Sequence, residues 1–389
     1  MRFVIEGIGL TSYGGKQVGL AVLPQLARHD EHQFTLLMPD LPDYAAIAGR
    51  NITKLLVAKP RGLVQRDALL NRRLPEVCKK ARASALACMG SFVPRRLPCP
   101  TVAFLQLPYL AYAEPAAESR LTLRERLINA YGRLCYRRMP PSVPVVVQTG
   151  AVKQRLVSSY GIDPRRICSI PYSLPPLPPR EGERRPARRP SDPFTFLCLG
   201  RYYPHKNVET LLDALRTLPL YTTLKARCVV NVKAAHHPGA RKFLAKVAEA
   251  GPDCGIVHTD PVGREELPNL YRAADAYILP TLLETYSFTY DEAMHFGLPI
   301  LTSDRDFARE RCQDAAIYFD PLDAESVAKA MARVMEDADL RASLVANGKR
   351  VLAAASTWDQ ITARFVEILE RVATGKSAQG PRGAHATAA

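Results

Sequence analysis

One strand–loop–helix–strand stretch in the second half of the chain constrains the fold more than any other feature. It predicts an apolar strand, Ala276–Leu279, then a loop, a helix and a second strand, Pro299–Thr302. The predicted helix has clear ends, because Ser287 or Thr285 can cap its start and Gly297 can take a left-handed conformation after its last turn. Two apolar strands joined through a helix indicate a parallel α/β sheet.

Two glutamates mark this stretch. Glu284 lies in the loop before the predicted helix, and Glu292 lies about a turn and a half inside it. Such a pair suits the two ends of an extended polyhydroxylated ligand, and the helix N-terminus between them favours a phosphate. An ordinary strand–loop–helix unit with two solvated glutamates explains the spacing equally well.

A pair of cations follows the apolar run Phe194–Leu199. Arg201 and Lys206 stand directly after this predicted strand, and a helical pattern begins at Val208. Cations between a strand end and a helix suit a diphosphate, because arginine can donate two parallel hydrogen bonds and lysine acts as a point charge. In parallel α/β sheets, ligands bind beyond the carboxyl ends of the strands.

In their order along the chain, these motifs resemble the retaining glycosyltransferases of family 4. The resemblance covers most of residues 194–372, and it is carried by Gly200-Arg201, Lys206-Asn207-Val208-Glu209-Thr210-Leu211, Leu270-Tyr271-Arg272-Ala273-Ala274-Asp275-Ala276, the block from Glu284 to Met294, and Gly297-Leu298-Pro299-Ile300. It implies the GT-B fold, an α/β fold of two Rossmann-like domains that face each other across a cleft. The segment Thr302–Ala308 resembles a subgroup that acts in bacterial surface-polysaccharide assembly.

The resemblance implies a role for each polar residue in binding a nucleotide-diphosphate sugar. Arg201 and Lys206 would bind the donor diphosphate and act in catalysis with Glu284, which would contact hydroxyls of the donor sugar. Glu292 would contact the ribose. Backbone amides after the first glutamate would meet the phosphate and the sugar, namely those of Tyr286, Ser287 and Phe288. This segment departs from the family, which commonly has Gly-Phe-Gly here, and glycine allows the closest backbone approach.

The first half of the chain begins with a predicted strand, Arg2–Glu6, and a glycine-rich stretch that leads into a helix near Lys16. Paired glycines at a helix start let backbone amides approach a phosphate or a sugar. A plain strand-to-helix turn explains the pattern equally well. Within the family resemblance, Gly14, Gly15 and Lys16 become candidates for binding the donor.

Two further candidates follow the predicted strand Thr101–Leu105. Many family members have a histidine near this point, beside the reacting sugar, whereas this chain has Gln106 and Tyr109. Either side chain can hydrogen-bond sugar or acceptor hydroxyls. A proline-containing turn with a core tyrosine is an equally good interpretation.

With 389 residues, two domains are expected. Our assignment comprises an acceptor-binding domain at 1–173, a Pro- and Arg-rich linker at 174–193, a nucleotide-sugar-binding domain at 194–356, a helix at 357–374 that crosses back to the first domain as in GT-B enzymes, and a disordered tail at 375–389.

The charge of the chain is unevenly distributed. Residues 1–190 carry 30 Lys and Arg against 13 Asp and Glu, whereas residues 191–389 carry 23 against 25. The asymmetry points to an anionic partner for the first half. We find no nucleic-acid-binding module, and therefore predict no nucleic-acid partner but an anionic membrane surface or a lipid-linked acceptor. Two stretches, Arg61–Arg82 and Arg120–Arg138, have the pattern of interfacial helices, although helices with their apolar stripes in the core fit it slightly better.

Several classes of protein are disfavoured. No apolar run reaches the roughly 18 residues of a membrane span, and the N-terminus resembles a first strand rather than a signal peptide. The nine cysteines contain no CxxC pair, so we expect free thiols and no zinc site. From these features and the basic charge of the first half, we expect the protein to lie in the cytoplasm, peripherally associated with the inner face of the cell membrane.

The sequence therefore predicts a retaining glycosyltransferase that moves a sugar from a nucleotide-diphosphate sugar to a glycan or lipid-linked acceptor in bacterial surface-polysaccharide biosynthesis. No DxD motif in a metal-site context is present, so we expect neither a metal ion nor another cofactor, with the leaving diphosphate stabilised by fixed cations and helix dipoles. Alternatives are a GT-B sugar-nucleotide epimerase, a phosphorylase, and an inactive sugar-nucleotide-binding scaffold, which the missing glycines after Glu284 would favour.

Overall fold

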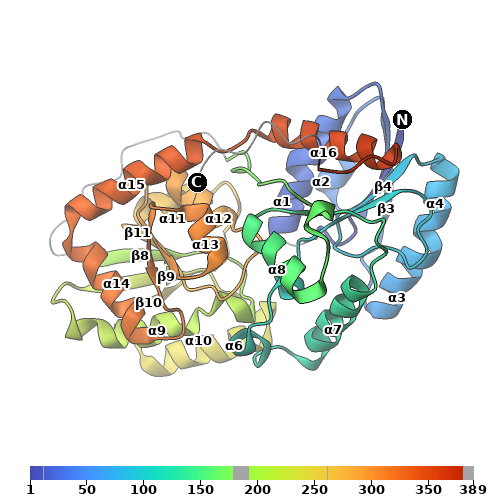
Figure 1. The fold of residues 1–389 in the computed structure, drawn as a ribbon. Helices are drawn as coiled ribbons and strands as arrows, with labels where there is room; N and C mark the ends of the chain where they lie inside the picture. The colour runs from blue at the N-terminus through green and yellow to red at the C-terminus, as the bar shows by residue number, and fades with distance from the viewer. Residues whose placement is uncertain (12, 178–191, 261, 380–389) are drawn as a thin grey trace. The chain divides into compact units, whose positions relative to one another are not determined.

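The computed structural model describes residues 1–11, 13–177, 192–260 and 262–379, so most of the expected linker and the end of the expected tail lie outside the described residues. The chain divides into two compact units (Figure 1). Unit 1 comprises Met1–Tyr112, Leu123–Pro175 and Ser356–Ala389, and unit 2 comprises Ala113–Thr122 and Pro176–Ala355.

A seven-stranded parallel sheet lies at the centre of unit 1. Its strands are β1 (Arg2–Glu6), β2 (Gln33–Pro39), β3 (Ile52–Val57), β4 (Ala85–Cys88), β5 (Thr101–Phe104), β6 (Val145–Val147) and β7 (Ile167–Ser169). Their order in the sheet is β3-β2-β1-β4-β5-β6-β7. The order reverses between β1 and β4, and in open α/β sheets ligands bind at such a switch point.

Helices surround this sheet. The α-helices are α1 (Tyr13–Val22), α2 (Pro42–Ala45), α3 (Leu63–Ala68), α4 (Leu74–Ala81), α5 (Pro108–Ala111), α7 (Leu123–Arg137), α8 (Gly150–Tyr160) and α16 (Trp358–Ala373). Shorter turns are the 3-10 segments η1 (Leu23–Arg28) and η3 (Pro164–Arg166) and the π-helical segment η2 (Leu69–Arg73). The last helix, α16, begins with a capping box formed by Thr357 and Gln360 and packs against α1, β4 and β5.

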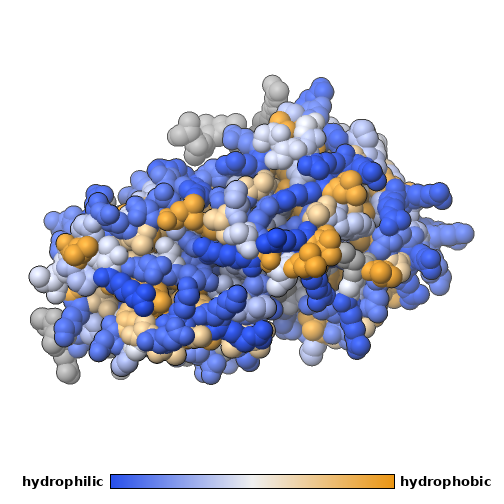
Figure 2. Space-filling model, turned by 90° about the horizontal axis from the view of Figure 1, so that it is seen from below, coloured by the Kyte–Doolittle hydropathy of each residue, from blue (hydrophilic) through white to orange (hydrophobic). Residues whose placement is uncertain are grey.

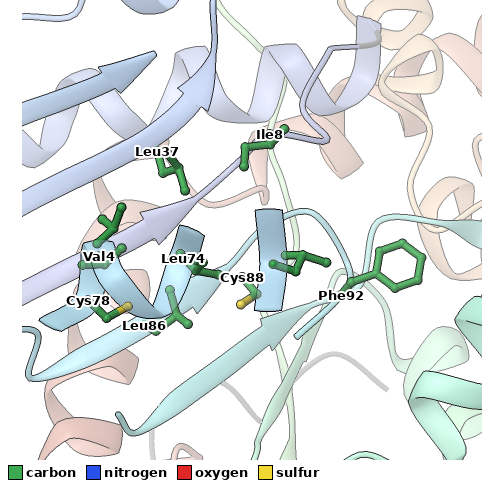
Figure 3. Packing of buried hydrophobic residues seen from close by; sticks show 10 residues of the cluster. Val4, Ile8, Leu37, Leu74, Cys78, Leu86, Cys88 and Phe92 are labelled. Atoms are coloured by element: carbon green, nitrogen blue, oxygen red, sulfur yellow. The ribbon is translucent and has the colours of Figure 1, made fainter. Parts of the chain in front are cut away.

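One hydrophobic cluster of unit 1 forms where the strands meet the α3–α4 segment. Figure 3 shows side chains from β1, β2, β4 and α4 packed together, among them Val4, Leu37, Leu74 and Cys88. Strands of a parallel sheet are covered on both faces, which is why they are almost continuously apolar. The apolar stripe of the stretch Arg61–Arg82 therefore packs largely in the core, through Leu70, Leu74, Val77 and Cys78.

Unit 2 repeats the same topology with six parallel strands. They are β8 (Phe194–Cys198), β9 (Ala226–Val230), β10 (Ile256–His258), β11 (Ala276–Leu279), β12 (Ile300–Ser303) and β13 (Ala316–Phe319), in the order β10-β9-β8-β11-β12-β13. The switch point lies between β8 and β11. The strands that the sequence predicts before Arg201 and before Glu284 are thus the two that flank it.

The helices of unit 2 connect these strands. They are α6 (Pro115–Glu118), α9 (Glu209–Thr217), α10 (Pro238–Ala250), α11 (Leu267–Ala273), α12 (Phe288–His295), α13 (Asp306–Cys312), α14 (Ala324–Glu336) and α15 (Ala338–Ala353), with 3-10 turns η4 (Pro204–Lys206), η5 (Leu218–Leu220), η6 (Ala234–His236) and η7 (Pro252–Cys254). None of the described helices has the length and apolar character that a bilayer crossing requires.

The structure differs from the expected domain ranges in two places. Residues 113–122, expected in the first domain, belong to unit 2, because α6 packs against η4 and Arg120 Nη1 donates to Asn207 Oδ1 at 2.7 Å. The expected disorder also does not hold for residues 375–379. Gln379 Nε2 donates to the Ile167 carbonyl at 2.9 Å, and Arg364 Nη2 donates to the Gln379 carbonyl at 2.8 Å.

Candidate active site

The predicted diphosphate-binding cations lie in the loop that follows β8. Gly200 has a φ of 144°, a conformation that favours glycine, and its amide donates to Asn231 Oδ1 at 2.9 Å. Arg201 is exposed beyond this turn. Lys206 ends the 3-10 turn η4, and Asn207 then takes a left-handed conformation with a φ of 52°. Both cations therefore stand at the carboxyl end of the central strand.

Hydrogen bonds join this loop to the loops after β11 and β13. The His205 carbonyl accepts from the Leu282 amide at 2.7 Å and from Thr281 Oγ1 at 3.2 Å. Asn207 Nδ2 donates to the Pro321 carbonyl at 2.7 Å. The two loops at the switch point therefore form one connected frame.

Lys206 and Glu284 meet inside this frame. Lys206 Nζ lies 2.5 Å from Glu284 Oε1, and Thr281 Oγ1 lies 3.2 Å from the same oxygen. Their side chains are 13% and 9% exposed, so the ion pair is largely withdrawn from water. A carboxylate and an ammonium group are thus presented together at one point, where a ligand with hydroxyl and phosphate groups can contact both.

The three residues expected to offer backbone amides lie at the start of α12. Ser287 is the N-cap residue, as predicted, but its side chain does not cap the helix: Ser287 Oγ lies 3.0 Å from Thr289 Oγ1 instead. Phe288 is the first helical residue, and Tyr286 donates its hydroxyl to Asp291 Oδ2 at 2.8 Å. Gly297 has a φ of 70°, as its predicted role at the helix end requires.

Glu292 directly follows Asp291 in α12 and is buried. Tyr271 donates its hydroxyl to Glu292 Oε2 at 2.6 Å. Burial raises the pKa of Glu292 to about 7, although the Tyr271 hydrogen bond and the charge of Arg264 act in the opposite direction. The two predicted glutamates therefore differ, since Glu284 has a cationic partner and Glu292 a neutral one.

A buried ion pair that was not predicted from the sequence lies behind this site. Asp291 is fully buried and accepts from Arg311 Nε at 2.7 Å as well as from Tyr286. Burial raises the pKa of Asp291, and the Arg311 charge opposes that shift. The signal was present in the sequence, because a charged residue on the buried face of a short helix needs a partner. The pair holds the hydroxyl of Tyr286, a residue that lies between the two glutamates in the sequence.

The glycine-rich stretch of unit 1 differs from expectation. Helix α1 begins at Tyr13, so Gly14, Gly15 and Lys16 lie within its first turn instead of in a loop before it. Lys16 Nζ pairs with Asp43 Oδ2 at 2.5 Å. A Cβ added to Gly15 would lie 3.2 Å from Gln106 Oε1, so this glycine permits a close approach between α1 and the loop after β5.

A pocket of about 290 Å³ occupies the switch point of unit 1, between the loops after β1 and β4. Gly15 and Gln106 line it, whereas Gly14, Lys16 and Tyr109 are not among its lining residues. Tyr109 is buried in α5, and its carbonyl accepts from Arg133 Nε at 3.2 Å. For Tyr109 the core interpretation fits better than the ligand-contacting one.

Glu6, which was not among the predicted site residues, holds the two loops of this pocket. Its carboxylate accepts from the Ile8 amide at 2.9 Å and from the Gly90 amide at 3.2 Å. Burial raises the pKa of Glu6, and the nearby charge of Arg66 opposes that shift. The signal was an acidic residue at the end of the apolar strand RFVIE, directly before the glycines.

The nine cysteines are free thiols. Among the described residues, no group of three or more His, Cys, Asp or Glu side chains is arranged to hold a metal ion. The fold and the site together define an α/β protein of two doubly wound units, with paired cations and carboxylates at a strand switch point suited to a phosphate-bearing, polyhydroxylated ligand.

Comparison with known families agrees with this class. Residues 179–351 match the family model described as Glycosyl transferases group 1. Residues 179–351 are thus similar to group 1 glycosyltransferases, and the resemblance of the second half of the chain to glycosyltransferases is confirmed.

Curated relatives include two mannosyltransferases. One is the GDP-mannose-dependent alpha-(1-6)-phosphatidylinositol monomannoside mannosyltransferase of Mycobacterium tuberculosis, 25% identical over 56% of this chain and 59% of the relative. Another is the O-antigen chain mannosyltransferase B of Escherichia coli, 27% identical over 44% of each chain. The matches span less than two thirds of the length of these relatives.

Solved structures with the same fold cover nearly the whole chain. Sucrose-phosphate synthase from Thermosynechococcus elongatus has a TM-score of 0.73 at 14% identity, over 97% of this chain and 100% of that one. WaaG, a glycosyltransferase involved in lipopolysaccharide biosynthesis, has a TM-score of 0.68 at 17% identity, over 95% and 99%. The expected GT-B fold of two Rossmann-like domains is confirmed.

Proposed function

We propose that this protein is a retaining glycosyltransferase that transfers a sugar from a nucleotide-diphosphate donor. The observation that carries the proposal is the Lys206–Glu284 pair at the switch point of unit 2, in the segment that matches the group 1 glycosyltransferase model. Arg201 lies in the same loop as Lys206, and Glu292 lies in the helix that follows Glu284. Arg201 and Lys206 bind the diphosphate, Glu284 the sugar hydroxyls and Glu292 the ribose. The names of the mannosyltransferase relatives make GDP-mannose the first donor to test.

The chemical step in this proposal is dominated by the leaving group. The bond between the sugar carbon and the diphosphate oxygen breaks through an oxocarbenium-like state, and the electron pair goes to the diphosphate. Arg201, Lys206 and the N-terminus of α12 stabilise that developing charge without a metal ion. The acceptor hydroxyl attacks from the same face, gives its proton to a donor phosphate oxygen, and the anomeric configuration is retained.

The acceptor in this proposal is a glycan or a lipid-linked molecule of bacterial surface-polysaccharide biosynthesis, reached at the inner face of the cell membrane. The uneven charge supports it, since the excess of Lys and Arg falls in residues 1–190. The relative and the solved structure whose names refer to O-antigen and lipopolysaccharide support it as well.

An inactive sugar-nucleotide-binding protein is the second candidate. It is favoured by the segment Thr285–Phe288, which lacks the glycines that allow the closest backbone approach to a ligand. Both candidates predict binding of the donor, whereas only the enzyme breaks it down.

The experiment therefore has two stages. A thermal-shift screen with UDP-, GDP- and dTDP-sugars identifies the nucleotide, because a ligand that binds only the folded state raises the melting temperature. Donor hydrolysis and transfer to a lipid extract are then measured with the best donor, and the anomeric configuration of the product is determined by NMR. Binding without turnover would support the inactive protein, and an inverted product would contradict the retaining mechanism.

A further inference from the structure

Unit 1 has two adjoining hollows that share part of their lining. The first is the 290 Å³ pocket at the β1–β4 switch point, and the second is a groove of about 670 Å³ between α3 and α7. Gly62, Arg124 and Ile128 line both. Arg124 Nη2 also donates to the Arg61 carbonyl at 3.0 Å, which ties the start of α7 to the segment before α3. The two hollows are therefore one continuous surface.

The pocket end of this surface is cationic. Lys59, Arg66 and Arg124 line it, and no carboxylate is among its lining residues. Arg66 extends over the Phe92 ring, 4.5 Å from the centroid, and donates to the Gly90 carbonyl at 3.3 Å. This is the one hydrogen bond found for the Arg66 guanidinium group within the described part of the chain, so most of its five N–H donors are available to a ligand.

A polar atom that needs a partner lies in the same pocket. Gln106 Nε2 is buried, and among the described residues no acceptor lies within hydrogen-bonding distance of it. An unsatisfied buried amide donor costs about 1–3 kcal/mol. A ligand oxygen that accepts a hydrogen bond from Gln106 Nε2 would remove this cost and so favour binding. Cations and an unpaired amide donor together favour an anion with several oxygen atoms.

The groove end is apolar and open to water. Val64 is 83% exposed, Leu123 73% and Leu127 54%. Hydrophobic side chains form small patches among hydrophilic ones on the face drawn in Figure 2. Apolar groups that cluster on a surface instead of packing in the core mark an interaction site. An anionic head next to an apolar stem is the chemistry that matches the whole surface.

We propose that this surface binds the acceptor as a single lipid molecule, with a phosphate group at Lys59, Arg66 and Arg124 and a hydrocarbon chain along Val64, Leu123 and Leu127. The inference rests on the proposed function and specifies its acceptor as a phosphate-bearing amphiphile. Charge complementarity selects the phosphate, and the exposed apolar groove beside it selects the chain.

Calorimetry with the full-length protein tests this assignment. Dodecyl phosphate, dodecyl maltoside and inorganic phosphate are titrated separately, the two amphiphiles below the concentration at which they form micelles. Dodecyl phosphate is expected to bind at least about tenfold more tightly than either other probe, because it alone supplies both parts. Equal affinity for dodecyl phosphate and dodecyl maltoside would overturn the cationic subsite, and equal affinity for dodecyl phosphate and inorganic phosphate would overturn the apolar groove.

Matched variants locate the two ends. Arg66→Gln and the more exposed Lys59→Gln should each weaken dodecyl phosphate about tenfold and leave dodecyl maltoside unchanged, whereas Leu127→Asp should weaken both amphiphiles. Arg72→Gln and Leu134→Asp, on neighbouring exposed positions outside both linings, are the controls and should change nothing. Loss of affinity in the controls alone would contradict the assignment. Nucleotide binding is measured on every variant: if no nucleotide binds the wild type while dodecyl phosphate does, the proposed function fails and the lipid site stands.

Discussion

Lys206 and Glu284 lie 78 positions apart in the chain, yet Lys206 Nζ is 2.5 Å from Glu284 Oε1. One residue follows β8 and the other follows β11, so the strand order of unit 2 brings them together. The residue predicted to bind the donor diphosphate and the residue predicted to bind the donor sugar are therefore electrostatically coupled. A substitution of either residue removes the charge that faces the other and so changes the electric field at the ligand.

Glu284→Gln should abolish sugar transfer without weakening the binding of the free nucleoside diphosphate. The substitution removes the carboxylate that contacts sugar hydroxyls, and it leaves the Lys206 charge fully available to the phosphates. Calorimetry with the nucleoside diphosphate should give an affinity equal to that of the wild type or a few-fold higher. Weaker binding would show that Glu284 contacts the nucleotide part of the donor.

Lys206→Ala should impair both catalysis and stability. Losing a charged donor to the leaving group costs roughly 2–4 kcal/mol in the transition state. It also leaves the buried Glu284 carboxylate without its cation, which costs about 3 kcal/mol in the free energy of unfolding. Steady-state kinetics and urea unfolding measure the two effects. Normal turnover in the folded variant would exclude Lys206 from the diphosphate site.

Arg201→Ala is the matched comparison, because Arg201 is exposed. The variant should lose transfer by a similar factor, again roughly 2–4 kcal/mol, while its free energy of unfolding stays near that of the wild type. If its stability falls as far as that of Lys206→Ala, the loss of activity reflects the structure of the loop and not a contact with the diphosphate.

The raised pKa of Glu292 predicts that nucleotide binding depends on pH. An ionised carboxylate accepts stronger hydrogen bonds from ribose hydroxyls than a protonated one, so affinity should rise roughly fivefold as the pH increases through about 7. Glu292→Gln should bind the nucleoside diphosphate more weakly and should lose this part of the pH dependence, which separates it from titration of the phosphates. An unchanged pH profile in the variant would contradict the ribose contact.

Glu292 also predicts how stability changes with pH. The folded state holds the proton to about pH 7, whereas the unfolded chain releases it near 4.5. Between these values the folded protein binds more protons, so the contribution is complete below pH 4.5 and is lost as the pH rises to 7, on the order of 3 kcal/mol in total. Urea unfolding at several pH values gives the free energy of unfolding of the wild type and of Glu292→Gln. Between pH 4.5 and 7 this free energy should fall further in the wild type than in the variant, by about that contribution.

Transfer should survive chelation with EDTA. Fixed cations and the N-terminus of α12 face the diphosphate in the proposed mechanism, so no metal ion is needed for the leaving group. Activity is measured before and after chelation. A complete loss that Mg²⁺ or Mn²⁺ reverses would show that a metal ion takes part in catalysis and would contradict the proposed metal-free mechanism.

The full-length protein should bind anionic lipid vesicles reversibly. Each basic residue near such a surface contributes about 1 kcal/mol, and salt screens this attraction over a Debye length of ~10 Å at 0.1 M. Co-sedimentation should therefore show binding at low salt that decreases at high salt, and no binding to uncharged vesicles. If the protein does not sediment with anionic vesicles at low salt, its basic first half has another partner.

Local sequence determined where most strands and helices of this protein begin and end. The apolar strands, the end of α12 at Gly297 and the positions of Arg201 and Glu284 after strands follow from periodicity and turn chemistry, which depend on neighbours in the chain. Tertiary structure alone decided which of these residues meet. The order β10-β9-β8-β11-β12-β13 places two loops together at the switch point, pairs Lys206 with Glu284, and buries Glu292 so that its pKa rises. Burial and pairing depend on contacts between distant segments, which is why the partners Arg311 and Tyr271 and the cationic pocket around Arg66 became visible only in the folded chain.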